Sequence, residues 1–273
     1  MSWFALKNGE RLFYEETGAG DRTVVMVHGW ASTRKVFAPV LPAVSRAARC
    51  VTYDQRGHGN SRQANREKVT MDTLADDLDA LIRGLGLGGV TLLGWSMGAG
   101  VVMDYVSRRG CGALRQLVLC DMTPRQRNDE DWNLGLYQGR FTKVLSEKEA
   151  RESFFSLYRE FAVNAVPRLS RIPGFLLGLP LKLKLSAYDE EVLISLALSM
   201  LEKDLRPCVE RITVPVHYFY AEPGSLFSPG LAGWYREHIR TPFRSVGFPD
   251  STHMLIYEHP RQFAREVIRA LDC

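Results

Sequence analysis

The sequence predicts an α/β fold built around a mostly parallel sheet. Short runs of β-branched and aliphatic residues, most of them ending at Gly or Asp, alternate with segments of helical periodicity. The runs lie at residues 23–27, 50–53, 90–93, 117–120, 214–220 and 243–247. Their nearly continuous apolar character is typical of parallel strands that are covered on both faces.

The amino terminus is expected to add a hairpin, formed by residues 3–6 and 11–15. Asn8-Gly9 lies between the two segments and suits a tight two-residue turn, because both residue types tolerate a positive φ. With these two strands the predicted sheet has eight.

Three segments have apolar residues at helical spacing, namely residues 70–83, 99–108 and 260–271. Gly84, Gly86 and Gly89 follow the first of them and match the spacing of a dinucleotide-binding loop. Such a loop follows a strand and opens a helix, whereas these glycines end a helix and precede a strand. They are therefore interpreted as a helix stop and a turn.

The alternation of strands and helices stops between residues 124 and 211, where helical patterns rich in Phe, Tyr and Leu take over. This predicts a helical cap of residues 124–211 inserted into an α/β core of residues 1–123 and 212–273. Its apolar side chains could line a substrate pocket or simply attach the cap to the core. The candidates are Phe141, Phe154, Phe155, Leu157, Tyr158, Phe161 and Phe175.

The overall composition is that of an ordinary globular protein. The 273 residues are 45% hydrophobic, which allows a sizeable core, and the formal net charge is only +4. The basic residues form no block, so the charge does not indicate a nucleic-acid partner. We also find no apolar stretch as long as a membrane span.

The cysteines indicate neither a disulfide framework nor a zinc site. They are five in number, at positions 50, 111, 120, 208 and 273, and they lack the C-x-x-C spacing. The amino terminus shows no secretory signal. A cytoplasmic location is therefore expected.

The strongest chemical motif is Gly94-Trp95-Ser96-Met97-Gly98, which follows a predicted strand and precedes a predicted helix. A serine on such a sharp turn needs small residues two positions away on either side, and Gly94 and Gly98 meet that need. The amino end of the following helix favours developing negative charge. Ser96 is therefore the predicted nucleophile.

A serine hydroxyl needs a base to take its proton, and His253 is the best candidate. It lies in the loop between the last predicted strand and the last predicted helix. His28-Gly29-Trp30 follows an earlier strand, and its loop is expected to supply a backbone N–H, that of Trp30. Together with the N–H of Met97 it would form an oxyanion hole.

Taken together, these motifs resemble those of the α/β-hydrolase superfamily. His28-Gly29-Trp30, the turn from Asp54 to Ser61, the serine motif and the late His253 occur in that family's order. The similarity is closest to small bacterial carboxylesterases and cofactor-free haloperoxidase-like members. It implies that the Asp54 turn, with Arg56 and His58, is scaffold rather than catalyst.

The acid of a Ser-His-acid triad is the point at which the sequence departs from the family. Members usually carry an Asp shortly after the seventh strand, where this chain has Gly224. Asp121, Glu222 and Asp250 are the possible substitutes. Asp121 is preferred because it follows a strand expected to lie beside that of Ser96, and catalytic groups gather at carboxyl strand ends.

The sequence thus predicts a serine hydrolase of the carboxylesterase type, acting on a small acyl substrate through an acyl-enzyme. It implies no cofactor and no metal. Two alternatives stay open: a ligand-binding receptor on a hydrolase scaffold, and a lyase or perhydrolase with the same serine and histidine. The natural substrate and the oligomeric state cannot be deduced from these motifs.

Overall fold

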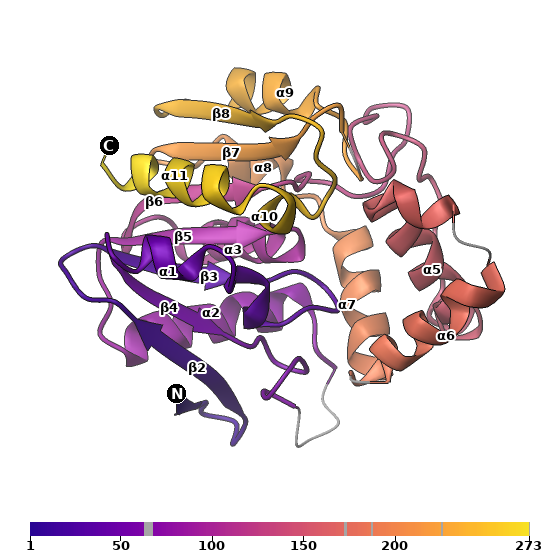
Figure 1. The fold of residues 1–273 in the computed structure, drawn as a ribbon, viewed down its shortest axis with the longest axis horizontal. Helices are drawn as coiled ribbons and strands as arrows, with labels where there is room; N and C mark the ends of the chain where they lie inside the picture. Colours follow the sequence, from indigo (N-terminus) through magenta and orange to yellow (C-terminus); the bar gives the residue numbers. More distant parts are fainter. Residues whose placement is uncertain (63–67, 172–173, 187, 225, 273) are drawn as a thin grey trace.

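The computed structural model describes residues 1–62, 68–171, 174–186, 188–224 and 226–272. A single sheet crosses the molecule in the order β1-β2-β4-β3-β5-β6-β7-β8, with helices on both faces and further helices beyond the carboxyl ends of its central strands (Figure 1). The strands are β1 (Ser2–Ala5), β2 (Arg11–Thr17), β3 (Thr23–Val27), β4 (Arg49–Tyr53), β5 (Val90–Trp95), β6 (Leu114–Cys120), β7 (Val216–Ala221) and β8 (Phe243–Phe248).

The predicted mostly parallel, eight-stranded sheet is confirmed. The pairs from β4 to β8 are all parallel, and the amino-terminal β1 and β2 are antiparallel to their neighbours. The hairpin between β1 and β2 also forms, but the prediction of a two-residue turn is wrong. Leu6 donates its N–H to the carbonyl of Glu10, so the loop has three residues, and Gly9 takes the positive φ of +84° that such a loop requires.

Helices connect the strands and surround the sheet. They are α1 (Leu41–Val44), α2 (Met71–Gly84), α3 (Met97–Arg109), α4 (Glu147–Glu152), α5 (Phe154–Ala165), α6 (Gly174–Leu185), α7 (Glu190–Glu202), α8 (Arg206–Val209), α9 (Leu231–His238), α10 (Leu255–Glu258) and α11 (Pro260–Leu271), with short 3₁₀ turns at Arg34–Phe37 and Pro167–Arg171. The three predicted helices are present as α2, α3 and α11. Gly84 ends α2, and Gly86 and Gly89 follow with positive φ, as expected for a helix stop and a turn.

Alternate residues of each central strand enter separate hydrophobic cores on the two faces of the sheet. In β3, for example, Val25 and Val27 face the core that α2 and α3 share, whereas Val24 and Met26 face the core beneath α1 and α11. Burial on both faces fixes the register of each strand, because a slip by one residue would exchange the two faces. The sheet is therefore a firm base for groups placed at its strand ends.

Between β6 and β7 the described part of the chain contains helices α4 to α8 and no strand. Figure 1 shows α5, α6 and α7 grouped beyond the carboxyl ends of the central strands. The loop after β3 binds to this group through Trp30, whose ring contacts Phe154, Tyr158 and Phe161 and whose indole N–H donates to the carbonyl of Leu193. Apolar side chains of these helices and of the α/β core belong to one hydrophobic cluster, so packing does not mark a boundary between them. The cap boundaries at residues 124 and 211 therefore stay a prediction.

The described helices include none that is both long enough and apolar enough to cross a membrane. Cys50, Cys111, Cys120 and Cys208 are buried free thiols, and Cys273 lies outside the described residues.

Candidate active site

Ser96 lies on the sharp turn between β5 and α3. Its backbone has φ 55° and ψ −129°, a conformation that costs an L-residue free energy and that is typical of functional turns. The turn leaves no room for a side chain at the positions two residues before and two residues after Ser96. A Cβ atom at Gly94 would lie 2.5 Å from the Cα of Ala99, and one at Gly98 would lie 2.0 Å from the carbonyl oxygen of Val27. The two glycines thus allow the serine to be presented at the carboxyl edge of the sheet.

Ser96, His253 and Asp121 form one buried hydrogen-bonded series. The Oγ of Ser96 lies 2.8 Å from Nε2 of His253, and Nδ1 of the same ring lies 2.7 Å from Oδ2 of Asp121. A carboxylate only accepts hydrogen bonds, so Nδ1 carries the imidazole proton and Nε2 is left to accept the serine hydroxyl. This is the tautomer that a general base requires.

Asp121 reaches the histidine from the end of β6, which pairs with β5 on one side and β7 on the other. It adopts a positive φ of 45°, and its Oδ1 accepts the N–H of Ala221 at the end of β7. The carboxylate is thereby tied to two strand ends, with Oδ2 directed at His253. The main chain of His253 is also held in place, because the carbonyl of His253 accepts a hydrogen bond from the indole N–H of Trp95.

The two other candidate acids do not meet the histidine. The Oε1 of Glu222 accepts the hydroxyl of Tyr220, and its carboxylate lies against the backbone of Gly247 in β8. Asp250 is exposed on a turn and has a positive φ of 54°. Of the three candidates, only Asp121 is joined to His253 by a hydrogen bond in the described structure.

Trp30 and Met97, the residues expected to form the oxyanion hole, line one cavity together with Ser96. Trp30 and Ser96 line the same cavities, and Met97 is the first residue of α3. Neither the N–H of Trp30 nor that of Met97 donates to a protein acceptor in the described part of the chain. Buried N–H groups are normally paired, so these two are available to an oxygen atom of a ligand.

The order of the strands and helices and the turn at Ser96 agree with the family to which the sequence can be matched. Residues 22–260 match the family model described as the alpha/beta hydrolase fold. The chain belongs to the α/β-hydrolase family.

Individual relatives differ in similarity and coverage. The non-heme chloroperoxidase CPO-A1 of Kitasatospora aureofaciens is 36% identical over a match of 164 residues, and the match covers 56% of this chain and 59% of that protein's length. The pimeloyl-[acyl-carrier protein] methyl ester esterase of Sodalis glossinidius is 26% identical over 93% of this chain and 95% of its own. The solved structure of the esterase EaEST from Exiguobacterium antarcticum has a TM-score of 0.81 and 21% identity, and it covers 100% of this chain and 99% of that one. This structural likeness concerns the fold alone.

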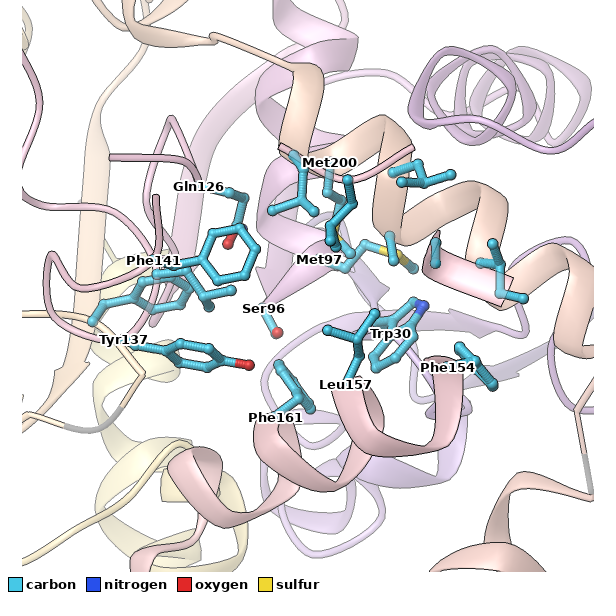
Figure 2. A pocket seen from close by; sticks show the side chains of 18 residues that line it. Trp30, Ser96, Met97, Gln126, Tyr137, Phe141, Phe154, Leu157, Phe161 and Met200 are labelled. Carbon is cyan, nitrogen blue, oxygen red and sulfur yellow. The ribbon is translucent and has the colours of Figure 1, made fainter. Parts of the chain in front are cut away.

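An apolar cavity of ≈ 90 Å³ opens at Ser96 on the side of Met97. Figure 2 shows the serine hydroxyl pointing into it, with aromatic rings and the side chain of Met200 around it. Of the predicted lining residues, Phe141, Phe154, Leu157 and Phe161 lie here. Tyr158 lines a second cavity beside it, Phe155 instead packs against Lys182, and the side chain of Phe175 lies outside the described residues.

Sequence reasoning misses several residues of this cavity, among them Gln126, Tyr137, Ile194 and Phe227. Phe227 follows β7, so its position after a carboxyl strand end is a signal that could have found it. Tyr137 has no such signal. Tyr137 and Gln138 both adopt a positive φ, 56° and 55°, in a loop that brings the tyrosine ring to the cavity (Figure 2).

Hydrogen bonds of buried side chains hold the turn after β4 in place. The Arg56 guanidinium binds the carboxylate of Asp77 through two hydrogen bonds of 2.8 and 2.6 Å. His28 accepts the N–H of Gln55 at Nε2 and donates from Nδ1 to the carbonyl of Gly29. Burial lowers the pKa of His28 to about 4 and that of His58 to about 3, so both rings are neutral at neutral pH. In the described structure, no cluster of three or more His, Cys, Asp or Glu side chains could hold a metal ion.

The lowered pKa values of these two histidines predict that the folded protein is less stable at acidic pH. Below about pH 6.5 an unfolded chain protonates its histidines, whereas the folded protein keeps His28 neutral down to about pH 4, so the free energy of unfolding falls as the pH is lowered. For His28 alone, the loss between pH 7 and pH 5 is about 2 kcal/mol. Urea unfolding at both pH values should show a smaller pH dependence for His28→Gln than for the wild type. An unchanged difference would contradict a neutral, buried His28.

Proposed function

We propose that this protein is a serine esterase that hydrolyses a small carboxylic ester. The observation that carries the proposal is the continuous hydrogen-bonded series from Asp121 through His253 to Ser96 at the opening of an apolar cavity. A nucleophile, a base and an orienting acid in that order are the parts that acyl transfer needs.

In the first half of the proposed reaction, Ser96 Oγ attacks the ester carbonyl carbon while its proton passes to Nε2 of His253. The carbonyl oxygen becomes an oxyanion and accepts the N–H groups of Trp30 and Met97. Each such donor typically contributes about 3 kcal/mol to the stability of the transition state. His253 then gives the proton to the departing alcohol oxygen as the C–O bond breaks, which leaves an acyl group on Ser96.

In the second half, water attacks the acyl-enzyme and His253 takes its proton. The second tetrahedral intermediate releases the carboxylic acid, and the proton returns to Ser96 Oγ. Asp121 keeps its charge throughout. It holds the ring in one tautomer and stabilises the imidazolium that forms twice in each turnover.

The names of relatives support an ester substrate. One protein that aligns with nearly the full chain is called a methyl ester esterase, and a solved structure of the same fold is called an esterase. The apolar inner cavity supports an acyl group without charge, because an unpaired charge would be costly there.

A panel of 4-nitrophenyl esters with unbranched acyl chains tests this proposal. We expect release of nitrophenol and the free carboxylic acid, with kcat/KM rising about fourfold for each added methylene until the inner cavity is full. The rise then stops, because the cavity is small. Chromatography of the products checks the reaction type. Turnover of no ester above the Ser96→Ala background, or products other than alcohol and acid, would exclude the proposed esterase.

A further inference from the structure

Two cavities of different character meet at Ser96. Trp30, Ser96 and Phe161 line both of them. The inner cavity of ≈ 90 Å³ has the largely apolar lining described above. The second cavity, here called the vestibule, has a volume of ≈ 420 Å³ and is more polar, with Ser32, Thr33, Lys35, Lys184, Tyr188 and Tyr257 in its wall.

The position of His253 decides which part of an ester occupies which cavity. His253 must donate a proton to the departing oxygen, so the leaving group has to lie on the side of its ring. The ring lines the vestibule and is absent from the lining of the inner cavity. The acyl chain therefore enters the inner cavity, and the leaving group lies in the vestibule.

The charged side chains described in the vestibule wall, apart from the histidine, are both positive. Lys35 comes from the 3₁₀ turn after β3 and Lys184 from α6, so two distant segments bring them to one cavity. No Asp or Glu appears in the described lining. Among the described residues neither Lys35 nor Lys184 forms an ion pair with a carboxylate, and both residues are exposed where they line the vestibule.

Two other cationic residues from the same part of the chain as Lys184 are engaged elsewhere. Lys182, two residues from Lys184, lies over the ring of Phe155, with Nζ 5.2 Å from the ring centroid. Arg168 pairs with Glu258 at 2.8 Å. Lys35 and Lys184, in contrast to these two, line the vestibule and have no partner of opposite charge among the described residues, which favours an anionic ligand.

We propose that the leaving group of the natural substrate carries a negative charge, such as a carboxylate, which Lys35 and Lys184 attract into the vestibule. The inference rests on the proposed esterase function and specifies the substrate of the same site. The two lysines would select the substrate and leave the chemical step to the residues at Ser96.

Two aryl esters with the same acetyl group provide the test. One carries a carboxylate on its nitrophenyl ring and the other a carboxamide at the same position, so the pair differs in charge and little in shape. For the wild type we expect a higher kcat/KM with the carboxylate. The carboxylate-to-carboxamide ratio should fall about threefold in Lys35→Gln or Lys184→Gln and about tenfold in the double variant.

Two controls make the result specific. Lys182→Gln should leave the ratio unchanged, because its side chain lies over Phe155. Raising the salt concentration to 1 M should reduce the wild-type ratio, since the screening length falls to about 3 Å.

The possible failures are distinguishable. If the wild type hydrolyses both esters and the lysine variants change both rates equally, or neither rate, the charge selection is wrong and the esterase proposal stands. If the wild type hydrolyses neither ester, the esterase proposal fails, and the inference about its leaving group fails with it.

Discussion

Replacing Ser96 by Ala is expected to lower kcat for ester hydrolysis by about six orders of magnitude, which leaves only a small residual activity above the uncatalysed reaction. The variant keeps His253 and the backbone N–H groups but has no atom to form the acyl-enzyme. The described partner of the serine hydroxyl is His253, so loss of Oγ should leave the fold intact. Steady-state kinetics with a 4-nitrophenyl ester and circular dichroism measure the two properties.

Ser107→Ala is a suitable control for this variant. Ser107 lies on the same helix, α3, but near its far end, where its hydroxyl accepts a hydrogen bond from Arg211. We expect its kcat to stay within a few-fold of the wild type. If Ser96→Ala retained substantial activity in a folded, pure preparation, Ser96 would not be the nucleophile.

Replacing Asp121 by Asn is expected to lower kcat by about four orders of magnitude. An amide at this position would donate its N–H to Nδ1 of His253, which moves the imidazole proton to Nε2. The ring could then no longer accept the proton of Ser96. Because an Asn carbonyl can still accept the N–H of Ala221, the loss should appear in kcat with little change in the free energy of unfolding.

The other two carboxylates are the matched controls for Asp121. Glu222→Gln keeps an acceptor for the hydroxyl of Tyr220, and Asp250→Asn changes an exposed turn residue that tolerates a positive φ. Both variants should retain turnover within a few-fold of the wild type. A severe loss in either of them, together with a mild effect of Asp121→Asn, would assign the acid to another strand end.

The elements that sequence reasoning predicts well are those determined by local rules. The turn at Ser96 needs small neighbours, and Gly94 and Gly98 are visible in the sequence as such. The buried strands show as apolar runs because both of their faces enter a core. The prediction of a two-residue hairpin turn was wrong because Asn8-Gly9 also fits a three-residue loop with Gly9 at its third position.

The remaining features depend on how distant segments meet. Asp121, Glu222 and Asp250 all lie near strand ends, and the pairing of β6 with β7 directs only Asp121 towards His253. The inner cavity likewise draws Tyr137 from an irregular loop and Ile194 from α7. No periodicity or spacing in one sequence encodes such a convergence, so the pocket cannot be deduced before the fold is known.

Covalent labelling with a fluorophosphonate tests the central claim, that Ser96 is an activated nucleophile, most directly. The native protein is treated with the reagent, digested and examined by peptide mass spectrometry. We expect a single phosphonylated residue, Ser96, with labelling that is lost in Ser96→Ala and strongly slowed in Asp121→Asn. An unlabelled native protein, or a label on another residue that persists in Ser96→Ala, would contradict the account.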